Sequence, residues 1–202
     1  MKRTVYAISG LVILVLVAYI ATIVFDAPKN DIDMSGVNFE NMSEEEMLRV
    51  RDRVLGEYAS VPGNVVFEEM PSVIGEPGRV DELFFTKLLE GYLEARYATK
   101  ANGLVEVFAL NPKNRFVRIT DFQLTNGPDL RVLLTSKENS ANADYLESDF
   151  VDLGKLKGTT GPQNYIIPSN VNLNDYDTLV IYSLAFKTVF ATADLSISDN
   201  SS

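Results

Sequence analysis

Short runs of β-forming residues, separated by turn residues, fill the second half of the chain. Valine, isoleucine, leucine, threonine and aromatic residues dominate the runs, and Asn, Gly and Pro stand between them. Such runs predict strands, and the lack of strand–helix alternation argues against a doubly wound parallel sheet. The predicted strands are residues 105–110, 116–122, 130–135 and 165–167, with turns at 111–114 and 126–129, and residues 179–186 and 187–195 form a last β segment or pair of strands. The sequence therefore predicts a mainly β protein whose C-terminal region is an antiparallel β-sandwich or barrel.

A short helical segment is expected before the β region. Ser43 and Glu46 have the spacing of a capping box, in which each side chain satisfies a backbone amide of the other residue. Apolar residues then recur at helical spacings, at Met47, Val50, Val54, Leu55 and Tyr58. We expect this helix to end near Tyr58, because Pro62 and a glycine follow. A second helical segment is expected over residues 80–89, with mostly loop between the two.

An uncharged apolar run covers residues 4–25, from Thr4 to Phe25. At about 1.5 Å per residue, a helix of this length reaches about 33 Å and can cross a hydrocarbon core of about 30 Å. Lys2 and Arg3 precede the run and acidic residues follow it, which predicts a cytoplasmic N-terminus. The alternative is a cleaved signal peptide, for which the run is long and lacks a small-x-small site. We favour a single-pass anchor in the lipid bilayer of the cell membrane, with an extracytoplasmic C-terminal domain.

The chain contains no Cys, no His and no Trp. Disulfides, Ser-His-Asp and Cys-His catalysis, and the thiolate or imidazole ligands of zinc, blue-copper and iron–sulfur sites are therefore excluded. Removing Lys2 and Arg3 from a net charge of −10 leaves −12 outside the anchor. A surface this acidic repels nucleic acid and anionic lipid. We expect no catalytic residues, no metal, no cofactor and no nucleic-acid partner.

Two polar stretches have some character of calcium loops. Residues 31–36 begin like an EF-hand loop, but Met42 replaces the bidentate Glu at the twelfth position. Residues 170–177 are rich in Asn and Asp and offer oxygen ligands. We interpret the first stretch as part of a juxtamembrane linker and the second as a loop that enters a strand.

Two further patterns are interpreted as turns. Residues 154–161 contain glycines and lysines without the Gly-Lys-Ser/Thr step of a phosphate loop. They predict a tight hairpin with Lys155 and Lys157 in solvent. Asp129 follows a Gly-Pro pair and is expected to close its turn on a backbone amide; the alternative is one member of a pair of catalytic acids.

Four blocks in the β region have a distinctive order and spacing. They are residues 127–134 (GPDLRVLL), 153–158 (LGKLKG), 161–168 (GPQNYIIP) and 180–190 (VIYSLAFKTVF), and residues 193–195 (ADL) close the series. With these blocks, residues 91–197 resemble the electron-transfer DM-thirteen family of extracellular domains. The residues that carry the resemblance are Gly127, Pro128, Asp129, Leu153, Gly154, Leu156, Gly161, Gln163, Tyr165, Pro168, Tyr182, Phe186 and Phe190.

The resemblance implies a β-rich extracytoplasmic module with a proposed redox role centred on a cysteine. Ser183 stands at the position of that cysteine, and a serine cannot cycle between thiol and disulfide. Because the predicted strand around Ser183 is apolar on both faces, we expect its hydroxyl to be buried and hydrogen-bonded to neighbouring backbone.

These predictions divide the chain into five parts. They are an anchor (1–25), a linker (26–42), a helical and loop segment (43–90), the β domain (91–197) and a polar tail (198–202). The favoured function is a non-enzymatic binding or accessory module for an unidentified protein partner at the cell surface. The alternative that the resemblance implies is a component of a cell-surface electron-transfer system. An enzyme that uses carboxylates or tyrosines, such as a glycosidase, is a third hypothesis, which no spacing of carboxylates supports.

Overall fold

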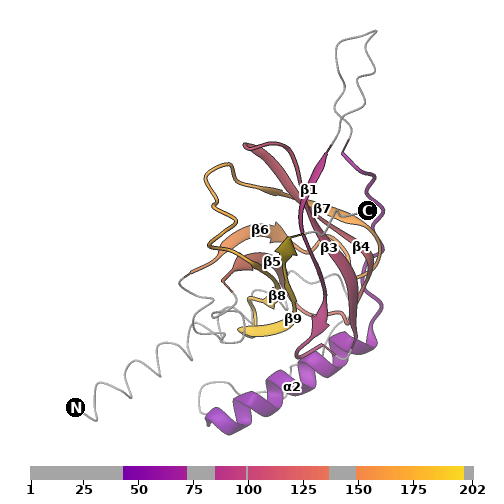
Figure 1. Cartoon of the computed structure of the whole chain (residues 1–202). Coiled ribbons are helices and arrows are strands. Elements are labelled where there is room, and N and C mark those ends of the chain that lie inside the picture. Colours follow the sequence, from indigo (N-terminus) through magenta and orange to yellow (C-terminus); the bar gives the residue numbers. More distant parts are fainter. Residues whose placement is uncertain (1–42, 72–84, 99, 137–148, 198–202) are drawn as a thin grey trace, which may run out of the picture.

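The structure is a computed structural model that describes residues 43–71, 85–98, 100–136 and 149–197. In this part of the chain one helix accompanies ten strands (Figure 1). The elements are α2 (Glu44–Ser60), β1 (Thr86–Tyr92), β2 (Glu94–Ala95), β3 (Ala101–Asn111), β4 (Asn114–Leu124), β5 (Leu130–Thr135), β6 (Val151–Lys155), β7 (Gln163–Ile167), β8 (Thr178–Ser183), β9 (Thr188–Asp194) and β10 (Ser196–Ile197).

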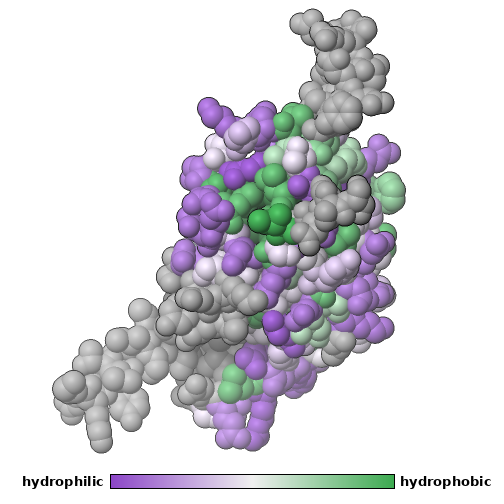
Figure 2. Space-filling view, in the orientation of Figure 1, coloured by the Kyte–Doolittle hydropathy of each residue, from purple (hydrophilic) through white to green (hydrophobic). Residues whose placement is uncertain are grey.

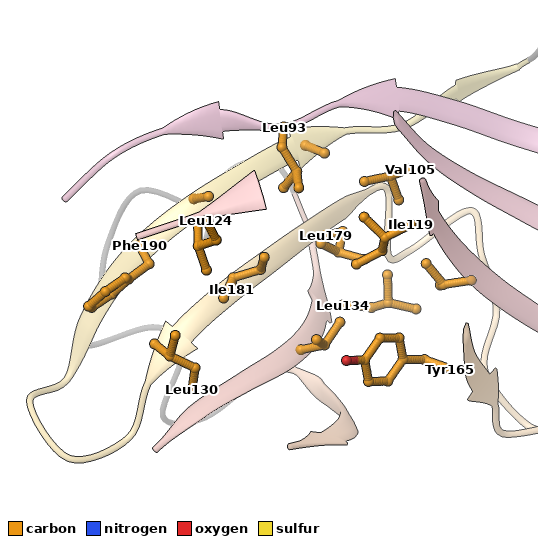
Figure 3. Packing of buried hydrophobic residues seen from close by; sticks show 14 of the residues in the cluster. Leu93, Val105, Ile119, Leu124, Leu130, Leu134, Tyr165, Leu179, Ile181 and Phe190 are labelled. Carbon is orange, nitrogen blue, oxygen red and sulfur yellow. The ribbon is translucent and has the colours of Figure 1, made fainter. Parts of the chain in front are cut away.

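The strands form two five-stranded antiparallel sheets. The first has the order β10-β1-β3-β4-β7 and the second the order β2-β9-β8-β5-β6. Inward-facing side chains of both sheets make one core, drawn from close by in Figure 3. Val105 and Ile119 of the first sheet belong to it, as do Leu134, Leu179 and Ile181 of the second. The mainly β prediction is confirmed, in the form of a two-sheet sandwich.

The predicted strands correspond to β3, β4, β5 and β7, and the last predicted β segment is the pair of strands β8 and β9. The predicted turn at 111–114 joins β3 to β4, where Asn111 pairs with Asn114. β8 is buried on both faces, as predicted, but ends at Ser183, and residues 184–187 turn the chain into β9. The short edge strands β2, β6 and β10 were not predicted, because an edge strand can alternate with exposed polar residues and give little apolar signal.

The second predicted helix is wrong where the structure describes it. Residues 80–84 lie outside the described part of the chain, and β1 begins at Thr86. A β-bulge between Lys87 and Leu89 inserts Leu88 into the strand. The bulge breaks the alternation expected of a strand, so the sequence of this segment gives no clear strand signal.

The predicted hairpin at residues 154–161 is also wrong. β6 pairs with β5 in the second sheet, whereas β7 pairs with β4 in the first. The glycine-rich stretch therefore carries the chain from one sheet to the other instead of folding back on itself. Lys157 is not simply in solvent, because its ammonium group lies 2.8 Å from a carboxylate oxygen of Glu68.

The capping box at the start of α2 is confirmed. The Ser43 amide donates to Glu46 Oε2 at 2.8 Å, and the Glu46 amide donates to Ser43 Oγ at 3.3 Å. The helix ends at Ser60, close to the predicted end, and crosses one end of the sandwich (Figure 1). Val54 and Leu55 on its inner face are buried in the core.

The membrane prediction concerns residues 4–25, which lie outside the described part of the chain. Among the described residues, no helix has both the length and the apolar character that a membrane crossing requires.

Figure 2 shows one face of the sandwich, where hydrophilic residues dominate and hydrophobic residues gather in the upper middle part.

Candidate functional site

Ser183 is the last residue of β8 and is fully buried. Its hydroxyl donates to the carbonyl oxygen of Pro128 at 2.8 Å and accepts from the amide of Phe186 at 3.4 Å. A neighbouring bond, from the Leu184 amide to the Asp129 carbonyl at 3.1 Å, joins the same two turns. The hydroxyl is therefore buried with backbone partners, as the apolar strand around it predicts.

The turn before β5 lies against the β8–β9 hairpin. A Cβ atom on Gly127 would lie 2.5 Å from two ring carbons of Phe190, so a larger residue here would have to displace this buried ring. Asp129 has φ of 44°, in the left-handed region that Asn and Asp tolerate better than most residues. The first and last motif blocks thus meet in one corner, which we call the Ser183 corner (Gly127, Pro128, Asp129, Ser183, Phe186 and Phe190).

Gln163 and Tyr165 on β7 belong to a separate buried network. Gln163 is fully buried, and its Oε1 accepts from the Tyr165 hydroxyl at 2.6 Å and from the Lys157 amide at 3.2 Å. Its Nε2 donates to the Gly158 carbonyl at 3.0 Å. Burial raises the pKa of Tyr165 well above its ordinary value. This network fixes the crossing between the sheets and keeps the tyrosine protonated.

The other motif residues support the frame. Leu153 and Leu156 pack partly buried against the core, and Gly154 has φ of 120°, a conformation that favours glycine. The carbonyl of Pro168 accepts from Arg115 Nη2 at 3.2 Å. Tyr182 is 2 % exposed and belongs to a small second cluster with Leu133 and Val180.

The comparisons with known proteins bear on this arrangement of motifs. The family model described as Electron transfer DM13 matches residues 95–195, half of the chain. The chain belongs to the electron transfer DM13 family. No curated protein and no solved structure matches the chain significantly.

The DM13 range begins at the end of β2 and ends just after β9. It therefore contains both the Ser183 corner and the Gln163 network, whereas α2 and β1 precede it and β10 follows it. The Ser183 corner has no redox-active side chain, because the chain has no Cys. Ser183 is also not an activated nucleophile, since its two hydrogen-bond partners are backbone groups and neither can act as a base.

The carboxylates of the DM13 domain are candidate metal ligands within the described residues. There, no group of three or more acidic side chains is placed to hold a metal ion. The calcium candidate at 170–177 is closed by its own hydrogen bonds, from Asn172 to Asp175 at 2.8 Å and from the Asn174 amide to Asn172 at 3.2 Å. The other candidate, at 31–36, lies outside the described part of the chain.

An extended segment that sequence reasoning missed lies along the DM13 domain. Residues 64–69, here called the strap, follow α2 and run beside β4 and β7 (Figure 1). The strap forms a parallel bridge between Val65 and Thr160 and places Glu68 against Lys157. The available signal was the set of glycines at 63, 158 and 161, since such clusters can mark close backbone approaches.

Proposed function

We propose that this chain is a single-pass membrane protein whose DM13 domain acts outside the cytoplasm as a non-enzymatic binding or accessory module for a protein partner. The observation that carries this proposal is the state of Ser183. A serine stands where the family resemblance places the redox cysteine, and its hydroxyl is fully buried and satisfied by backbone groups. This environment suits a structural residue.

The residues left for electron transfer support the same proposal. Haem, copper and iron–sulfur centres in proteins are held mainly by Cys, His and Met. The chain has no Cys and no His, and its Met residues, at positions 1, 34, 42, 47 and 70, all precede the DM13 range. The residues of the domain therefore do not fit a resident redox centre of these types.

A second candidate function is a component of an electron-transfer system at the cell surface. The family is described as an electron transfer family, which favours this second function. Because the domain lacks the usual ligands, this function requires that a partner supply the redox group and that the DM13 domain position or bind that partner.

One experiment separates the two functions. The full chain is purified in mild detergent from the membranes of its native cells together with any partner that stays bound, and the visible absorption spectrum and metal content of this preparation are measured. The accessory module predicts neither a chromophore nor a stoichiometric redox metal. A chromophore or redox metal at one equivalent per chain would overturn the proposal and favour the electron-transfer function.

A second experiment tests the anchor. Intact cells or spheroplasts are treated with protease, and their membranes are washed with carbonate. We expect the chain to stay in the membrane pellet and its DM13 domain to be digested from outside. Release of the chain by carbonate, or protection of the domain until the cells are lysed, would contradict the proposed topology.

A further inference from the structure

The strap is attached to the DM13 domain mainly through its backbone. The Val66 amide donates to the Thr160 carbonyl at 2.9 Å, and the Glu68 amide donates to the Pro162 carbonyl at 2.9 Å. In return, the Thr159 amide donates to the Asn64 carbonyl at 2.8 Å. This is the hydrogen-bonding mode by which exposed sheet edges take up an extended peptide.

Two glycines of the domain let the strap approach this closely. A Cβ atom on Gly158 would lie 2.7 Å from the Asn64 carbonyl oxygen, and one on Gly161 would clash with the Val66 carbonyl oxygen. Gly161 also has φ of 93°, which favours glycine. The domain thus offers a backbone surface without side chains at the two points where the strap passes.

A carboxylate receptor lies at the end of this surface. Lys157 Nζ lies 2.8 and 2.9 Å from the two carboxylate oxygens of Glu68, and the Asn164 amide donates to Oε2 at 2.7 Å. Arg118 Nη1 donates to the Glu68 carbonyl at 3.1 Å. The donors to the carboxylate select an acidic side chain, because charged partners strengthen each hydrogen bond. Arg118 binds the backbone of the extended segment.

Two of the three apolar side chains of the strap do not hold it in place. Val65 is 76 % exposed and Phe67 is 79 % exposed. The attachment therefore depends on backbone hydrogen bonds and on hydrogen bonds from the Arg118 and Asn164 side chains, which have small net free energies, and on one partly exposed ion pair. Such a segment can be exchanged for another without unfolding the core. The receptor surface lies within the DM13 range, whereas the strap lies outside it.

We propose that the edge formed by residues 157–164 is a peptide-binding site and that the strap is its intramolecular occupant. The ligand class is an extended segment of another protein that carries a carboxylate two residues after an apolar residue of the size of valine, as Glu68 follows Val66. This inference depends on the proposed function, because it identifies the ligand class of the binding module. The strap then acts as a competitor that such a partner must displace.

The test uses the full chain in detergent and a fluorescent peptide with the sequence of residues 63–70. In the chain variant Glu68→Lys, repulsion from Lys157 should release the strap and leave the receptor free. We expect this variant to bind the peptide at least about tenfold more tightly than the wild-type chain, whose own strap competes at an effective concentration of order millimolar. A peptide with Lys in place of Glu68 should not bind.

The matched control is Glu69→Lys, which makes the same charge change one residue along. Glu69 is exposed, and its carbonyl is the group that accepts from the Asn164 side chain, at 2.9 Å. This variant should behave like the wild-type chain. Hydrogen exchange should show faster exchange at the Val66 and Glu68 amides in Glu68→Lys alone, with the core strands still protected.

Four results would overturn the inference. They are a strap that stays protected in Glu68→Lys, a released strap without peptide binding, equal binding by the Glu69→Lys control, and dimerisation of Glu68→Lys that increases with concentration. The last result would identify a second copy of the chain as the occupant. If the peptide does not bind, the proposed function as a non-enzymatic module still holds, and its ligand binds elsewhere. The proposed function itself is contradicted only by the absorption spectrum and metal content.

Discussion

The Ser183 hydroxyl donates a 2.8 Å hydrogen bond to the carbonyl oxygen of Pro128, which lies 55 positions away in the sequence. The Ser183 Oγ atom also accepts from the Phe186 amide, so one small side chain links the turn before β5 to the turn after β8. A structural hydroxyl thus stands where the family resemblance places a cysteine. Because the chain has no Cys, a cysteine introduced at this position is its only thiol, and the rate at which it is labelled reports on this position alone.

We expect Ser183→Cys to fold into the same structure with a small loss of stability. The thiol is a weaker donor than the hydroxyl, so the free energy of unfolding should fall by about 1 kcal/mol, as for one buried hydrogen bond. In the folded protein the thiol should react slowly with a thiol reagent, because Ser183 is fully buried. Urea melts and labelling rates measure the two effects.

Ser169→Cys is the matched control, since Ser169 is exposed in the loop after β7. It should react at once in the native protein, whereas Ser183→Cys should react at that rate only in urea. Equal rates in native buffer would mean that position 183 is open to solvent. A loss of several kcal/mol in Ser183→Cys would contradict both the structural role assigned here and the match to the family's cysteine position.

Alanine substitutions at two glycines separate backbone strain from contact with the strap. Gly154 and Gly161 both have positive φ, of 120° and 93°. Around Gly154 an added Cβ meets nothing within 4 Å, whereas at Gly161 it meets the Val66 carbonyl. Both variants should lose about 1 kcal/mol or more through strain. Gly161→Ala should lose more in urea melts, and it alone should expose the strap amides to hydrogen exchange.

The sequence predicted the features that depend on neighbouring residues. The capping box needs only Ser43 and Glu46, and the β3–β4 turn needs only the polar residues at 111–114, so both were found. The burial of Ser183 was also predictable, because the apolar residues on both faces of its strand are adjacent to it. Its partner Pro128 was not predictable, since that contact depends on how the second sheet is assembled.

The strap shows why the rest could not be predicted. Its central carboxylate, Glu68, contacts Lys157 and Asn164, which lie 89 and 96 positions away in the sequence. No local pattern distinguishes such an acid from a solvated one. In β1, by contrast, the local pattern misled, because the bulge between Lys87 and Leu89 removes the alternation expected of a strand.

The strap should also weaken at acidic pH. Partial burial acts to raise the pKa of Glu68, but hydrogen bonds from Lys157 and the Asn164 amide, with the charges of Lys157 and Arg118, outweigh it and lower that pKa. A carboxyl whose pKa is lower in the folded state adds stability above its unfolded pKa of about 4.3, and this stability is lost as the pH falls through the folded pKa. Wild-type protein should therefore melt at a higher temperature than Glu68→Gln at neutral pH, and the difference should shrink in acid.

The control for this pH effect is Glu69→Gln, which removes a carboxylate next to Glu68. Its melting temperature should follow that of the wild-type protein across the same pH range. A gap between wild type and Glu68→Gln that stays constant from neutral to acidic pH would show that the carboxylate charge does not hold the strap.

The Gln163 network predicts a non-additive pair of substitutions. Tyr165→Phe removes the hydroxyl that donates to Gln163 Oε1. Because Oε1 still accepts from the Lys157 amide, the free energy of unfolding should fall by about 1 kcal/mol. Gln163→Leu leaves the Tyr165 hydroxyl and the Gly158 carbonyl without this partner, and the loss should reach about 3 kcal/mol or more. The double variant should lose less than the sum of the two, because no tyrosine hydroxyl is then left unsatisfied. Urea melts of the four proteins measure the coupling, and strictly additive losses would mean that the two side chains do not share the hydrogen bond.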